Sequence, residues 1–127
     1  MSVPVVLQEK LYAGAALLGK EGYPVKLDGS GKVVLATAAT DIVIGILDRG
    51  GEAIGDYCEI IVSGECTRAQ CASNAAAFTF CVASATGLDD TITTGASTGY
   101  IVGRWLQSAV SGGQYRFDVN ITPMGVA

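Results

Sequence analysis

The sequence has 127 residues, of which 16% are charged, with a net charge of −4 and a pI near 4.5. Its length predicts one domain, its scattered basic residues argue against nucleic-acid binding, and no apolar run approaches the ~20 residues that span a bilayer. The first ten residues lack the basic start of a signal peptide, so we expect a protein made in the cytoplasm. Low charge and 17 glycines favour a protein that covers part of its surface with neighbouring subunits.

Residues 1–10 form an apolar N-terminal segment. Pro4 keeps the residue before it extended. We therefore expect either an edge strand of the chain's own sheet or an extended N-terminal arm that adds to a neighbour's sheet by strand pairing. In the second case the interface residues are Val3, Pro4, Val5, Val6 and Leu7.

Lys10–Leu18 is the one stretch with a helical spacing of apolar residues, but its glycines limit it to a turn or two; a strand ending at Gly19 is the alternative. Tyr23–Leu27 alternates apolar and polar side chains as a half-buried strand does. The glycines that follow Asp28 predict a hairpin turn, with Lys32–Leu35 as the returning strand.

Ile42–Gly64 has the clearest pattern in the chain. A β-branched run to Leu47 is followed by a glycine-rich polar loop and by a second strand that starts at Tyr57 and ends at Ser63-Gly64. Further along we expect strands at Cys66–Arg68 and Phe78–Val82, a turn at Gly87–Asp90 and a link at Ala96–Gly99.

A shift of 58 residues aligns this stretch, without a gap, with Tyr100–Thr122. It places Gly45 on Gly103 and Tyr57 on Tyr115. We interpret this as two copies of one β-unit, residues 22–64 and 78–122, followed by a tail at 123–127; even turn spacing in a small β protein is the alternative explanation. The prediction is a single all-β domain over residues 1–127, folded as a small β-barrel or β-sandwich.

Catalytic groups are scarce in this sequence. It contains no histidine, the commonest general base and metal ligand, and Cys66 and Cys71 have the wrong spacing for a zinc site. Without a secretion signal, free thiols are favoured over disulfides for all four cysteines. We expect no enzymatic activity, no cofactor and no metal. Trp105 is expected in the core or, alternatively, as an interface anchor, and Tyr12 is a further interface candidate.

Three motifs carry a resemblance to a known family: Tyr23-Pro-Val-Lys-Leu-Asp-Gly-Ser-Gly-Lys-Val-Val-Leu-Ala, Val43-Ile-Gly-Ile-Leu and Gly55-Asp-Tyr-Cys-Glu-Ile-Ile-Val-Ser-Gly. They look like motifs of the small capsid cement (decoration) proteins of tailed bacteriophages. The resemblance covers Gly22–Thr122. In one departure, Ala76-Ala77 stand where that family tends to show Gly-Asp.

The resemblance implies a structural protein of the virion that binds the outer surface of the capsid. Its partners would be an HK97-like major capsid protein, at contacts between capsomers, and further copies of itself in a homotrimer or a dimer. There it would hold the shell against the pressure of the packaged genome. The alternative, from a different class, is a small β-barrel ligand-binding or accessory module with a cleft between the two repeats.

Overall fold

The computed structural model describes residues 4–7, 11–90 and 99–123. These residues contain no helix, and so none that could cross a membrane. The prediction of an all-β chain is confirmed. The strands are β1 (Val5–Leu7), β2 (Pro24–Leu27), β3 (Val33–Leu35), β4 (Gly45–Gly50), β5 (Cys58–Gln70), β6 (Phe80–Ser84), β7 (Gly87–Asp89), β8 (Tyr100–Trp105) and β9 (Gln114–Pro123).

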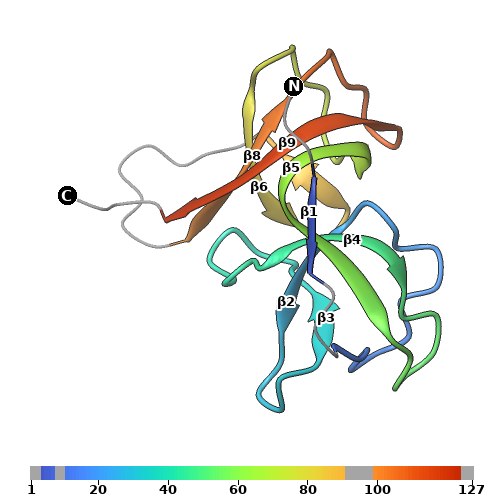
Figure 1. Ribbon diagram of the computed structural model, residues 1–127. Coiled ribbons are helices and arrows are strands. Elements are labelled where there is room, and N and C mark those ends of the chain that lie inside the picture. Colours follow the sequence, from blue (N-terminus) through green and yellow to red (C-terminus); the bar gives the residue numbers. More distant parts are fainter. Residues whose placement is uncertain (1–3, 8–10, 91–98, 124–127) are drawn as a thin grey trace.

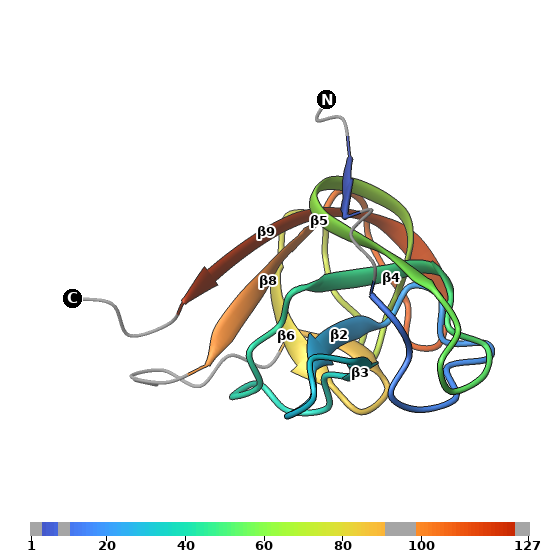
Figure 2. The same cartoon turned by 60° about the horizontal axis from the view of Figure 1, so that its bottom comes forward.

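Eight of these strands form one antiparallel sheet in the order β3-β2-β4-β5-β9-β8-β6-β7, which curls into a half-barrel (Figure 1). β1 lies outside this path and pairs with β5. Figure 2 shows β8 and β9 extending together, away from the body of the molecule. Of the two predicted architectures, the curled sheet corresponds to an open barrel and not to a sandwich.

β5 is the strand that both halves of the sheet share, and it changes partner near Gly64. Its first part pairs with β4, up to Ile61, and its second part pairs with β9, from Gly64 onward. Gly64 has a φ of 89°, which residues with a side chain rarely adopt. The predicted strand end at Ser63-Gly64 is therefore wrong, because the glycine redirects the strand without ending it.

The two halves of the sheet have the same connectivity. Strands β3-β2-β4-β5 correspond in order to β7-β6-β8-β9. At one equivalent position, Gly22 N–H donates to Leu47 O at 2.8 Å, and Phe78 N–H donates to Trp105 O at 2.7 Å. Leu47 and Trp105 are 58 residues apart, but Gly22 and Phe78 are 56 apart (78 − 22). The constant shift of 58 residues is thus not kept throughout, and descent of the halves from one duplicated unit stays a prediction.

Two local predictions are wrong. Residues 11–18 contain no helical turn, because their backbone groups bond to other strands: Ala13 bridges Val33 in parallel. Gly87–Asp89 is strand β7, paired with β6, and the turn comes before it. The predicted link at Ala96–Gly99 lies mostly outside the described residues, as does most of the tail at 123–127.

Buried side chains form one cluster in each half. The first-half cluster includes Leu17, Val25 and Leu47. The larger cluster includes Trp105 and Phe117, whose rings meet edge to face with 4.9 Å between their centroids. Because Trp105 is fully buried, its observed role is in the core, and its alternative role as an exposed interface anchor is wrong for this structure.

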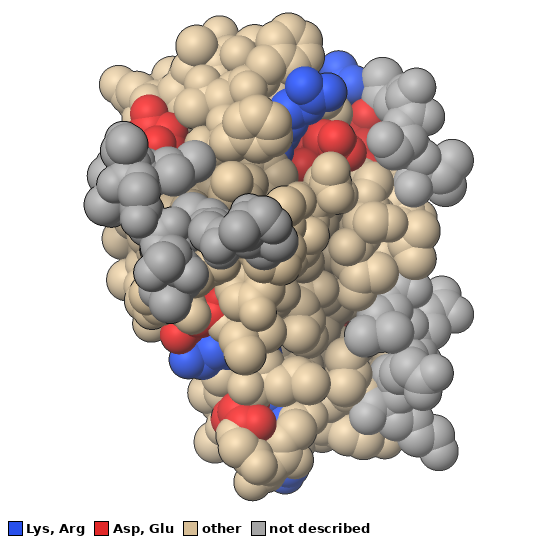
Figure 3. Space-filling model, turned by 90° about the vertical axis from the view of Figure 1, so that its left-hand side faces the viewer, with Lys and Arg blue, Asp and Glu red and all other residues tan. Residues whose placement is uncertain are grey.

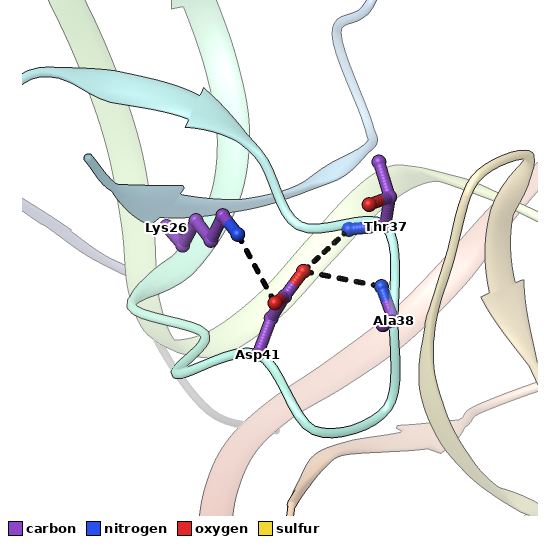
Figure 4. Close-up of polar contacts among 4 residues, drawn as sticks. All are labelled: Lys26, Thr37, Ala38 and Asp41. Atoms are coloured by element: carbon purple, nitrogen blue, oxygen red, sulfur yellow. Dashed lines mark hydrogen bonds and ion pairs between the residues drawn. The ribbon is translucent and has the colours of Figure 1, made fainter.

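The β3–β4 connection is held by Asp41. Its carboxylate forms an ion pair with Lys26 of β2 at 3.0 Å and accepts the backbone N–H groups of two loop residues, Thr37 and Ala38, at 2.8 and 3.1 Å (Figure 4). Burial by itself would raise the pKa of Asp41, but the lysine and the two amides outweigh it and hold the pKa below its ordinary value. The network therefore stabilises the loop as long as the carboxylate is charged.

Candidate functional site

β1 is the described part of the predicted N-terminal arm. It pairs with residues 60–63 of β5 in the same chain. Because β4 takes the other edge of β5 there, β1 lies on the edge along which β9 continues. Pro4 and Val5 are exposed, Val5 by 52%; Val3 lies outside the described residues, and Val6 and Leu7 are placed here by their backbone pairing. The arm is intramolecular in this structure, and its exchange with a neighbour stays a prediction.

Tyr12 lies beside Tyr57 in the first half of the sheet. The two residues form a backbone bridge, and their rings meet edge to face with 6.5 Å between centroids. Such a pair stabilises its own geometry by about 0.5–1.5 kcal/mol. Both rings are partly exposed, so Tyr12 presents a preformed aromatic surface to solvent.

An ordered turn next to Tyr57 presents an isoleucine to solvent. The Asp56 carboxylate accepts Ala53 N–H at 2.9 Å, and Asp56 N–H donates to Ala53 O at 3.1 Å. These bonds fix the backbone of what we call the Ala53–Asp56 turn. Ile54, at its tip, is 69% exposed, and the carboxylates of Glu52 and Asp56 flank it in the sequence.

A second exposed apolar surface lies in the other half, beside β6 and β8. It consists of Phe78, Phe80 and Arg104, and we call it the aromatic patch. Phe78 is 61% exposed and Phe80 50%. Phe80 and Arg104 are register partners, which places their side chains on one face, and the Arg104 guanidinium lies 5.5 Å from the Phe78 ring centroid, within cation–π range. Among the described residues, Arg104 forms no ion pair.

The sequence analysis did not single out Phe78, Phe80 or Ile54. A phenylalanine in a predicted strand is normally assigned to the core, and β6 has three consecutive buried residues after Phe80, so alternation does not reveal its exposed face. One signal was available. Phe78 occupies the position that Gly22 occupies in the first half, and a large apolar residue in place of a glycine marks a local difference between the halves.

A small polar pocket lies at the seam between the halves, near the side chains of Glu21, Asp48 and Arg68. Its volume is about 50 Å³, which holds a few water molecules. Sites for small organic ligands typically have about 300–1,000 Å³. This pocket is in the place expected for a ligand cleft between repeats, but it is too small for such a ligand.

The four cysteines are free and buried, which confirms the prediction of free thiols. Burial raises the pKa of Cys66 to about 11 and that of Cys81 to about 12. Both thiols are therefore neutral at pH 7, whereas nucleophilic attack and metal binding need the thiolate. Within the described ranges, no group of three or more His, Cys, Asp or Glu side chains is placed to hold a metal ion.

Neutral surface dominates the side of the molecule toward which β8 and β9 extend (Figure 3). Charged side chains occupy only small, separate areas of that face. In comparisons with known proteins, no family model and no curated protein matches this chain. The surfaces that can act are thus the exposed apolar ones at the aromatic patch, at Tyr12 and at the Ala53–Asp56 turn.

Proposed function

We propose that this chain is a structural virion protein that binds the outer surface of a tailed-phage capsid and stabilises contacts between capsomers of an HK97-like major capsid protein. One observation carries the proposal: large apolar side chains are exposed in both halves of a fixed half-barrel. They are Val5, Tyr12, Leu18, Leu27, Ile42, Ile54, Tyr57, Phe78, Phe80 and Val110. Exposed apolar groups of this number favour contact with other proteins.

Spread over the surface, such contacts suit an oligomer that engages several capsid subunits at once. Each contact can be weak while the sum is strong, because the second and third contacts form at high effective concentration. The proposal includes a homotrimer, with a dimer as the alternative, made in the host cytoplasm and located on the virion. It includes no enzymatic activity, cofactor, nucleic acid or membrane.

Cosedimentation tests this proposal. The purified chain is mixed with empty capsids assembled from the major capsid protein of the same virus, and bound protein is measured as a function of concentration. We expect saturable binding at a fixed number of copies per capsid. Binding that does not saturate, or no binding at any concentration, would contradict the proposal.

A deletion of Ser2–Leu7 tests the role of the N-terminal arm in that binding. β1 contributes only three paired residues, and the stabilisation from their hydrogen bonds is largely offset by the entropy lost in ordering them. We expect circular dichroism and melting to change little, and capsid affinity to fall about ten-fold or more as one set of contacts is lost. If the truncated chain unfolds or aggregates, these residues belong to the core and the arm does not bind the capsid.

The ligand-binding alternative has less support. It would need a cleft between the halves, and the pocket found at that seam holds only a few water molecules.

A further inference from the structure

Phe78 has a backbone conformation that the equivalent residue of the first half reaches as a glycine. The φ angle is +68° at Phe78 and +94° at Gly22, and each N–H donates to the carbonyl of the corresponding residue, Trp105 or Leu47. A bulky side chain is strained at positive φ, where a glycine is not. Strain of this kind persists mainly where the residue serves binding or switching.

The surroundings of the two residues differ in a way that exposes Phe78. A Cβ atom on Gly22 would lie 2.2 Å from Arg68 O, and Gly22 O accepts Gln70 N–H at 2.9 Å, so β5 covers this position in the first half. No described backbone N–H donates to Phe78 O. The second half therefore lacks a covering segment at the position where the first half has one.

We propose that the aromatic patch binds the Ala53–Asp56 turn of a second copy of this chain. The patch offers two exposed phenylalanine rings beside a guanidinium that has no ion-pair partner among the described residues. The turn offers the complementary chemistry, since its apolar tip, Ile54, is flanked by the carboxylates of Glu52 and Asp56. An apolar side chain seated between aromatic rings, with charges paired at its rim, is the usual arrangement of an interface anchor.

Both surfaces are already ordered, which lowers the entropic cost of contact. The turn is fixed by the hydrogen bonds between Ala53 and Asp56, and the patch by the register of β6 with β8. The β4–β5 connection and β6 belong to different halves of the sheet (Figure 1). Two different surfaces are therefore used on each copy, and such a head-to-tail contact closes into a ring or continues as a chain of copies.

This inference rests on the homo-oligomer within the proposed function but needs no capsid. Its test is sedimentation of the purified chain over a range of concentrations, with charge reversals at the two surfaces. Arg104→Glu and Glu52→Arg should each weaken self-association about ten-fold or more, because each places like charges together. The double variant should return to within about two-fold of the wild type, since it restores the pair in reverse. Glu52 is chosen because the Asp56 carboxylate is needed to hold the turn.

Phe78→Gly is a second and independent test. It relieves the strained φ and removes the ring, so the variant should melt at least as high as the wild type while its self-association weakens about ten-fold. Leu18→Ala, which truncates an exposed side chain outside both surfaces, should leave both quantities unchanged.

Four outcomes would overturn the inference: a wild-type chain that stays monomeric up to about 1 mM, charge reversals without effect, a double variant that fails to recover, or a Phe78→Gly variant that melts lower. Capsid cosedimentation of Arg104→Glu separates this inference from the proposed function. If capsids bind while the wild-type chain does not self-associate, only the inference fails.

Discussion

Alanine at Gly45 or at Gly103 should destabilise the fold, because both glycines lie where two neighbouring strands approach most closely. An added Cβ atom would lie 2.3 Å from Ile61 O at position 45, and 1.9 Å from Asp118 O at position 103. Ordinary contact begins near 3.4 Å. The strands must therefore separate by about 1.1 Å (3.4 − 2.3) or about 1.5 Å (3.4 − 1.9), since the obstructing atoms belong to the backbone.

The expected cost follows from two contributions. Overpacking of this kind costs about 1–3 kcal/mol, and weakening one or two ladder hydrogen bonds adds about 0.5–1.5 kcal/mol each. We expect each variant to lose about 3 kcal/mol in free energy of unfolding, measured by urea denaturation, and about 10 °C in melting temperature. Because the two glycines occupy equivalent places in the two halves, the two losses should be similar.

Gly29→Ala is the matched control, because an added Cβ atom there meets nothing within 4 Å. It should change the free energy of unfolding by less than about 0.5 kcal/mol. If Gly45→Ala and Gly103→Ala unfold at the same urea concentration as this control, the close approach of these strands is refuted.

Three further predictions concern charge, thiols and the core. Asp41→Asn should cost about 1 kcal/mol at pH 7; because the pKa of Asp41 is lowered in the folded chain, this stabilisation is present above the ordinary value of 3.8 and lost as pH falls below it, so wild type and variant should converge near pH 3 in urea denaturation. Added reductant should leave the melting temperature unchanged, since all four thiols are free, and a fall of many degrees would reveal a disulfide. Trp105→Phe should cost about 1 kcal/mol against about 3–5 for Trp105→Ala, because the indole N–H has no described acceptor to lose; equal costs would contradict this.

The sequence predicts local structure well where neighbouring residues determine it. The hairpin after Asp28 forms as expected, because the Asp28 carboxylate accepts the N–H groups of Ser30 and Lys32 at 2.8 and 3.0 Å. The fate of Gly64 depends instead on β9, which lies some fifty residues later in the chain. A glycine read by itself marks a strand end, and only the new partner strand turns it into a bend within β5.

The candidate surfaces were less predictable than the strands. Hydrophobicity identifies Trp105 and Phe80 alike as core residues, and only the pairing of β6 with β8 places one inside and the other at the surface. The strained φ of Phe78 has no signature in the sequence, because its neighbours impose it. The arm could be identified by its apolar residues, but its pairing with β5 of the same chain could not, since both expected arrangements use the same side chains.

A cryo-EM map of purified virus particles tests the central claim most directly. The account predicts density for this chain on the outer surface of the shell, at the junctions between capsomers, with the exposed apolar side chains of both halves facing capsid subunits or neighbouring copies. Particles without such density, or with the chain found only inside the shell, would contradict it.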